Sequence, residues 1–133
     1  MSDERKRLGY LASPYMHDDM KIREQRFKEV AYIGAQIMAS GDHVICPITM
    51  CHPMAMSLHF LPGDFKFWGE FDTNIISRCD YMVIAPLDGW LTSVGIRAEI
   101  KIAREFQKEI FMARLNSGHK YLGYDYYKGE LDV

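Results

Sequence analysis

Leu8-Gly-Tyr-Leu-Ala12 is the stretch that decides the fold, because it opens a strand–helix–strand unit. This apolar run leads into Ser13-Pro14-Tyr15, which predicts a buried strand followed by a loop. Over residues 20–40, apolar residues recur at three- and four-residue steps, the spacing of an amphipathic helix. Residues 43–47 predict a second strand. A strand, a helix and a strand in this order favour parallel pairing with a right-handed crossover.

The same alternation continues along the chain. Residues 65–78 predict a helix, and residues 81–85 are apolar without alternation, as in a central strand. A helix over 93–106 and a fourth strand over 109–113 follow. Strands that alternate with helices favour a three-layer α/β domain. We therefore expect a flavodoxin/Rossmann-like parallel sheet of four to five strands with helices on both faces.

Two segments lack a clear pattern. Residues 48–63 are rich in Met, His and Pro, and they predict an irregular loop with one helical turn at most, after which Asp64 caps the next helix. Residues 117–133 carry four tyrosines and predict either a short final element or a contact with a partner subunit. With no repeat or linker, we expect a single domain over 1–133 with its core at about 8–113.

Composition excludes several classes of protein. The chain of 133 residues is 48% hydrophobic and 26% charged, the balance of one soluble globular domain. Its formal net charge of −2, without a dense basic run, gives no reason to expect duplex nucleic acid as a partner. No stretch approaches the ~18 apolar residues of a membrane span, and the polar first residues do not resemble a signal peptide.

The three cysteines favour reduced thiols, and hence a cytoplasmic protein. His43, Cys46, Cys51 and His52 lie close together in the sequence, but their spacing matches no zinc pattern. We expect neither a metal nor a cofactor.

In sheets of this kind, ligands bind beyond the carboxyl ends of the strands. Three segments occupy those positions, namely residues 12–15, 47–63 and 86–99. The last contains a polar loop that enters a helix, where backbone N–H groups and the hydroxyl of Ser93 suit an anion such as a phosphate.

Glu99 lies about a turn and a half beyond that loop, so it faces the same cleft. A lone helix glutamate is most simply a solvated side chain. Asp72 changes this interpretation, because it is a second carboxylate, placed beside the apolar Phe71 on the preceding helix. Two carboxylates in one cleft are the groups that glycosyl transfer needs.

Four segments of the sequence occur in the same order as motifs of a known protein family. They are Tyr10-Leu-Ala-Ser-Pro-Tyr15, Asp72 eight residues before Asp80, the Ser93/Gly95/Glu99 motif, and the closing strand after Lys108. Together, over about residues 8–113, they resemble the nucleoside 2-deoxyribosyltransferase superfamily, which includes the nucleoside 5′-monophosphate N-glycosidases. The most specific part is Ser93-x-Gly95-x-x-x-Glu99-Ile-x-x-Ala103, and residues 61–68 resemble a branch whose members are mostly uncharacterised.

The resemblance implies an enzyme that cleaves the bond between a sugar and a nucleobase. It implies that Glu99 attacks C1′ to form a covalent glycosyl-enzyme, that Tyr10 orients Glu99, and that Asp72 assists the departure of the base. The physical chemistry agrees, since an adjacent carboxylate stabilises an oxocarbenium-like transition state and a hydrogen-bonded base leaves more readily.

Position 93 bears on the substrate. In the base-exchanging transferases of the family that this sequence resembles, the corresponding residue is an aspartate, which accepts a hydrogen bond from the free 5′-hydroxyl. In the monophosphate hydrolases it is a serine. An aspartate would repel a phosphate, because like charges in a partly dry site cost several kcal/mol. Ser93 thus favours a 5′-phosphate. The expected substrate contacts are Ser13, Asp88, Ser93, Gly95, Trp68 and Arg26, with Arg23 as an alternative to Arg26.

Other parts of the site follow less directly from the motifs. Ser13-Pro14-Tyr15 stands where the hydrolases carry a turn containing Gly and Arg. Further candidates for the wall against which a base stacks are Met54, Met56, His52 and His59. In the family a neighbouring subunit often completes the site, which implies a homodimer or higher homo-oligomer, with Asn116, Ser117 and the tail as the contributing residues.

Four functions remain open at this point. The leading one is hydrolysis of the N-glycosidic bond of a (deoxy)nucleoside 5′-monophosphate, and the nearest alternative is transfer of 2-deoxyribose between bases. Cleavage of NAD or a related nucleotide and a catalytically silent nucleotide-binding module are the others. The presence of Tyr10, Asp72 and Glu99 together argues against the silent module.

Overall fold

The computed structural model describes residues 6–58, 65–127 and 129, and within them five strands form one sheet in the order β2-β1-β3-β4-β5. The strands are β1 (Leu8–Ala12), β2 (His43–Ile45), β3 (Tyr81–Ile84), β4 (Glu109–Leu115) and β5 (Tyr121–Tyr126). The first four pair in parallel, and β5 is antiparallel to β4 at one edge. This is the order of a doubly wound, flavodoxin-like sheet, in which β1 and β3 flank the point where the winding direction reverses.

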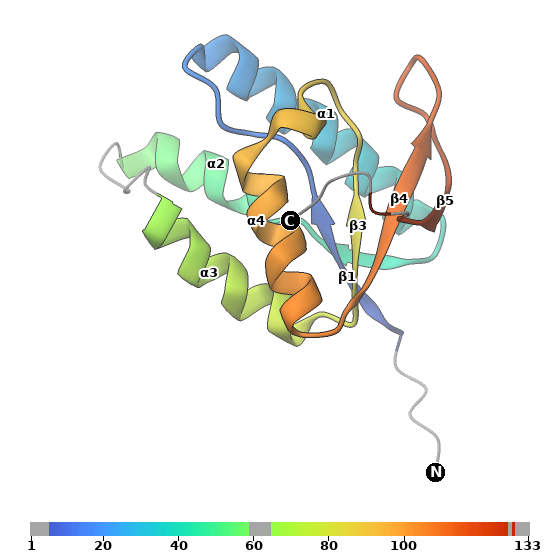
Figure 1. The fold of residues 1–133 in the computed structure, drawn as a ribbon. Coiled ribbons are helices and arrows are strands. Elements are labelled where there is room, and N and C mark those ends of the chain that lie inside the picture. Colours follow the sequence, from blue (N-terminus) through green and yellow to red (C-terminus); the bar gives the residue numbers. More distant parts are fainter. Residues whose placement is uncertain (1–5, 59–64, 128, 130–133) are drawn as a thin grey trace.

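Helices cover both faces of this sheet (Figure 1). They are α1 (Met20–Ala39), α2 (Pro47–Leu58), α3 (Phe65–Arg78) and α4 (Val94–Glu105), with a short 3-10 helix, η1 (Trp90–Thr92), before α4. One buried cluster joins α1 to the sheet, and a second joins α3 and α4 to the opposite face. The predicted three-layer α/β fold is therefore confirmed.

Strand β1 lies in the interior between the two helical layers. Because side chains alternate along a strand, Leu11 packs in the α1 cluster while Tyr10 and Ala12 pack in the α3/α4 cluster. Tyr10 is 1% exposed, and the strand is apolar on both faces, as a central parallel strand must be. The alternation thus directs the Tyr10 side chain toward the layer that carries Asp72 and Glu99.

The prediction of an irregular loop over residues 48–63 was wrong for residues 48–58. Residues 47–58 form the helix α2, with Pro47 at its first position, where a proline is well tolerated. The helix packs against α1 but keeps Met50, Met54 and Met56 exposed, so its hydrophobic residues follow no single stripe and the period is hidden. The predicted cap Asp64 lies outside the described residues.

The tail contributes a strand to the sheet. Residues 121–126 form the edge strand β5, and the aromatic rings of Phe111 and Tyr124 pack with centroids 4.8 Å apart. Gln36 of α1 fixes the start of this strand with two hydrogen bonds. Its Nε2 donates to the His119 carbonyl, and its Oε1 accepts from the Tyr121 N–H, both at 2.9 Å.

A search of the described residues for a helix long and apolar enough to cross a membrane finds none.

We predict that Gln36→Ala lowers the free energy of unfolding by about 1–3 kcal/mol, because it leaves two partly buried backbone groups without their partners. Urea denaturation measures the change. The matched control is Gln25→Ala on an exposed position of the same helix, which should change stability by less than about 0.5 kcal/mol. Equal losses in the two variants would contradict the structural role of Gln36.

Candidate active site

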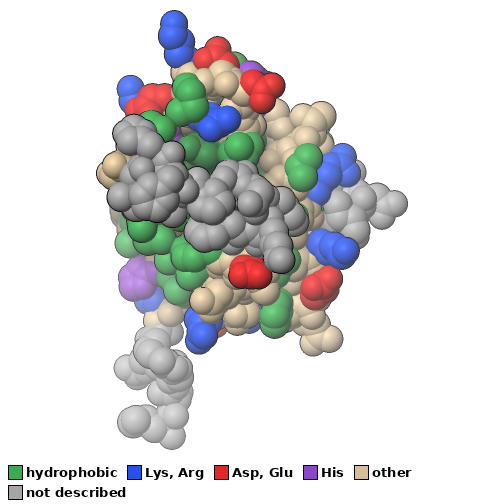
Figure 2. Space-filling view, turned by 90° about the vertical axis from the view of Figure 1, so that its left-hand side faces the viewer, with side chains coloured by type: hydrophobic (Ala, Val, Ile, Leu, Met, Phe, Trp, Pro, Cys, Tyr) green, Lys and Arg blue, Asp and Glu red, His purple; other side chains and the backbone are tan. Residues whose placement is uncertain are grey.

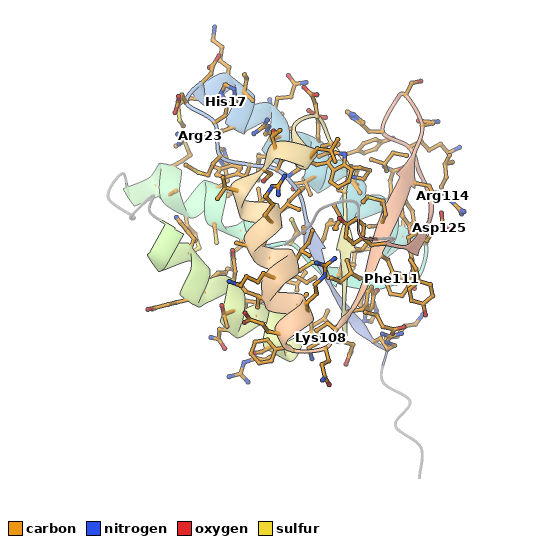
Figure 3. All side chains as sticks on the ribbon, viewed as in Figure 1. His17, Arg23, Lys108, Phe111, Arg114 and Asp125 are labelled. Carbon is orange, nitrogen blue, oxygen red and sulfur yellow. The ribbon has the colours of Figure 1, made fainter. Side chains whose placement is uncertain are left out.

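A cavity of about 530 Å³ opens at the carboxyl edge of the sheet, beside the ends of β1 and β3. Its lining comes from all three segments that the sequence placed at this edge, together with the first turns of α1 and α3. In Figure 3, the labelled residues His17 and Arg23, near the start of α1, lie at this carboxyl edge of the sheet. Lys108, just before β4, lies at the opposite edge. The size is that of a small-molecule site.

Tyr10, Asp72 and Glu99 all line this cavity, although they come from β1, α3 and α4. The Tyr10 hydroxyl donates a hydrogen bond to Oε2 of Glu99. Both carboxyl-bearing residues are partly buried, so each has only limited contact with water. The structure therefore brings together the three residues to which the sequence assigned catalysis.

Burial changes the protonation of this group. It raises the pKa of Asp72 to about 6, and the Tyr10 hydroxyl opposes part of that rise. Burial and the neighbouring Asp72 charge raise the pKa of Glu99 well above its usual range, again opposed by Tyr10. Burial and the two carboxyls also raise the pKa of Tyr10, which keeps it a neutral donor. The two carboxyls thus hold a proton at a higher pH than an exposed pair, and they titrate as a coupled unit.

Ser93 begins α4 at one side of the cavity. Its hydroxyl oxygen accepts from the Ile96 N–H at 3.1 Å, the geometry of an N-cap, and Ser93, Val94 and Gly95 all line the cavity. The first N–H groups of a helix carry partial positive charge, which favours an anion beside them.

Arg26 joins the two loops that flank the point of reversal. Its guanidinium donates to the Met16 carbonyl at 2.9 Å and to the Asp88 carbonyl at 3.4 Å. Gly89 makes room for it, since a Cβ at that position would lie 2.5 Å from Nη2, and its φ of +91° also favours glycine. Arg26 and Arg23 line the cavity, whereas the Asp88 side chain is exposed and does not.

Ser13 is the buried polar residue that stands out in the lining. It is 4% exposed, and its Oγ has no hydrogen-bond partner among the described residues. Buried hydroxyls nearly always have a partner, because leaving one unpaired costs about 1–3 kcal/mol. A ligand in the cavity is a chemically reasonable partner for it.

The candidates for the base wall separate into two groups. Trp68 lines the cavity and packs edge-on against Phe71, with centroids 6.4 Å apart. Met54 and Met56 do not line it and are 50% and 42% exposed. Figure 2 shows hydrophobic side chains among charged ones on the face that it presents. His59 lies outside the described residues, and Asn116 and Ser117 are absent from the cavity lining.

The sequence did not predict a second hydrogen-bonded group in the cavity. The Tyr15 hydroxyl lies 2.5 Å from Nδ1 of His52, and Nε2 of His52 lies 2.7 Å from Oε2 of Glu24. The hydrogen bonds of His52 could not be predicted because His52 lies on α2, and the sequence did not predict that helix. Cys51 also lines the cavity, and burial raises the pKa of its thiol to about 11. Across the described residues, no group of three or more His, Cys, Asp or Glu side chains is placed to hold a metal ion.

Fold and site together define a Rossmann-like α/β domain with a carboxylate-bearing cavity at its switch point. A family model described as "Domain of unknown function (DUF1937)" matches residues 7–114, and the chain belongs to that family. The matching family has no assigned function, in agreement with the expectation that the members of this group are mostly uncharacterised.

No curated protein matches the chain. Among solved structures, the chain is similar to the Clostridium botulinum CMP N-glycosidase BcmB, at 20% identity and a TM-score of 0.47, over 79% of this chain and 66% of that one.

We predict that Glu99→Gln stabilises the protein at pH 7. The native Glu99 has a raised pKa, so above about pH 4 the native state binds more protons than the unfolded state, and stability falls as pH rises. A neutral glutamine removes that loss, so at pH 7 the variant should unfold at a higher temperature than the wild type. The gain should vanish below about pH 4, where both states of the wild type are protonated.

Thermal unfolding at a series of pH values tests this, with Glu105→Gln, an exposed position of the same helix, as the control. If Glu99→Gln gains stability to the same extent at every pH, or loses stability at pH 7, the raised pKa of the buried Glu99 carboxyl is contradicted.

Proposed function

We propose that this protein hydrolyses the N-glycosidic bond of a nucleoside 5′-monophosphate and releases the free base. The observation that carries the proposal is the hydrogen bond from Tyr10 to Glu99, in a cavity that Asp72 also lines. One carboxylate that is oriented and one carboxyl that retains a proton are the two groups that glycosidic cleavage requires.

The proposed reaction has two steps. In the first, a carboxylate oxygen of Glu99 bonds to C1′, the bond from C1′ to the base nitrogen breaks, and its electron pair leaves with the base. Asp72 delivers a proton to the base as it departs. In the second step, water attacks C1′, Asp72 takes the proton of that water, and the bond to Glu99 breaks. Tyr10 stabilises the Glu99 carboxylate in the free enzyme and as leaving group.

The remaining lining residues fit the other parts of such a substrate. The start of α4, with the hydroxyl of Ser93 and the guanidinium of Arg26, supports a phosphate site. The unpaired hydroxyl of Ser13 supports a further polar contact. Trp68 supports a stacking contact with the base, because its indole ring lies on the cavity wall.

Transfer of a deoxyribosyl group between bases is the second candidate. The first loop favours it, because Ser13-Pro14-Tyr15 differs from the turn expected of monophosphate hydrolases. The two reactions share the Glu99 intermediate and differ only in whether water or a second base resolves it. The cytoplasmic location and the homo-oligomeric state stay predictions.

We predict base release from a panel of nucleosides and their 5′-monophosphates, measured with and without an acceptor base. Release without an acceptor supports hydrolysis, and release that needs one supports transfer. Glu99→Gln should lower turnover by a factor on the order of 10³ or more, since it removes the nucleophile. The control Glu105→Gln should keep wild-type turnover. Near-normal turnover in a folded Glu99→Gln protein would remove Glu99 from the mechanism.

The same assay has an expected pH dependence. Turnover should fall at alkaline pH, because burial raises the pKa of both Asp72 and Glu99 and the departing base needs the last proton that the pair holds. In Asp72→Asn the rate should be lower and that alkaline decline should disappear.

Ser93→Asp tests the phosphate site. Aspartate is as good an N-cap as serine, so the helix start is kept while a negative charge is added. Turnover of 5′-monophosphates should fall by a factor on the order of 100, and turnover of nucleosides with a free 5′-hydroxyl should be kept. Ser93→Asn, a neutral cap of the same size, is the control. Equal losses in the two variants would argue against a phosphate at this position.

A further inference from the structure

A chain of three hydrogen-bonded side chains reaches the cavity, and the proposed reaction does not use it. It runs from Tyr15, in the loop after β1, through His52 of α2 to Glu24 of α1. Only Tyr15 and His52 line the cavity, and the Glu24 side chain is 47% exposed. The chain therefore connects a cavity-facing phenol to a carboxylate outside the cavity.

Packing fixes the orientation of the histidine ring. His52 is 4% exposed, and its ring stacks on Phe27 with centroids 4.5 Å apart and planes at 25°. The ring of Tyr15 meets it edge-on, at 5.6 Å and 81°. Because both ring nitrogens are engaged at once, a rotated ring would break two hydrogen bonds.

The carboxylate sets the direction of each hydrogen bond. A carboxylate can only accept, so Nε2 of His52 must carry the proton that faces Glu24. In its neutral form the imidazole has one N–H, which leaves Nδ1 as an acceptor, so in that form the Tyr15 hydroxyl donates to it. Burial raises the pKa of Tyr15, so the hydroxyl keeps the proton that it donates. With that proton committed, the Tyr15 oxygen offers only lone pairs to the cavity.

We propose that Tyr15 is a specificity-determining residue that accepts a hydrogen bond from an N–H group of the nucleobase. This rests on the proposed function, in which the cavity binds a nucleotide. A base with an amino group at the contacted position satisfies the Tyr15 oxygen. A base with an oxo group at that position places its own lone pairs against those of the Tyr15 oxygen. Neither oxygen then has a hydrogen-bond donor, and polar binding sites discriminate strongly against such a mismatch.

The test compares nucleoside 5′-monophosphates that differ by one amino or oxo group, namely the cytosine and uracil pair and the adenine and hypoxanthine pair. Binding is measured by calorimetry on Glu99→Gln protein, and base release is measured on the wild type. In at least one pair, we expect the amino form to be favoured about tenfold or more. Tyr15→Phe should remove that preference.

Glu24→Gln tests the direction of the chain without touching the cavity lining. A carboxamide can donate to Nε2, which moves the ring proton to Nδ1 and turns the Tyr15 hydroxyl toward the ligand. The preference for the amino form should then fall or reverse. The matched control is Glu29→Gln on the same helix, since Glu29 pairs with Nδ1 of His119 at 3.2 Å and does not line the cavity. It should leave the preference unchanged.

The outcomes separate this inference from the proposed function. An unchanged preference in both Tyr15→Phe and Glu24→Gln, with base release intact, overturns the role of Tyr15 and leaves the glycosidase. A preference seen in binding, with no base release from any nucleotide, overturns the glycosidase and leaves the role of Tyr15. Equal binding of both members of each pair by Glu99→Gln protein overturns the role of Tyr15, and no binding of any of the four nucleotides contradicts both.

Discussion

The hydrogen bond between Tyr10 and Glu99 is the interaction on which the rest of the site depends. It joins a central strand to the first turns of α4, inside a layer that is otherwise apolar. Two carboxyls beside one another in such a layer destabilise the folded chain whenever both are ionised. The hydroxyl that Tyr10 donates and the proton that the carboxyl pair retains reduce this cost, and the proposed reaction uses the same two features.

The topology explains why these groups meet. At the point where the winding reverses, β1 and β3 send their following loops to opposite faces, so the space above them is left open. Loops from both sides then line one cavity, together with the starts of α2 and α3. Residues as far apart in sequence as Tyr10 and Glu99 come within hydrogen-bond distance only because parallel strands place all their carboxyl ends at one edge.

The sequence predicted those parts of the structure that leave a local pattern. Strands β1 to β4 and helices α1, α3 and α4 were visible in apolar runs and periods, and the rule for carboxyl ends then predicted where the cavity lies. The helix α2 was missed because its exposed methionines conceal its period. Missing α2 also hid the hydrogen bond of His52 to Tyr15, since the partner of a buried histidine depends on which way its helix faces. Gln36 holds the start of β5 through a contact between residues far apart in sequence, which no local pattern records.

Arg26 has a consequence for how a ligand would be bound. The side chain already ties the backbone after β1 to the backbone after β3, through the carbonyls of Met16 and Asp88. The two loops are therefore ordered when the chain folds, and an arriving anion need not supply that conformational entropy itself. By the same linkage, an anion that engages the guanidinium would strengthen the connection between the two halves of the sheet. In the proposed site, the side chain that orders the two loops is therefore also the one that contacts the anion.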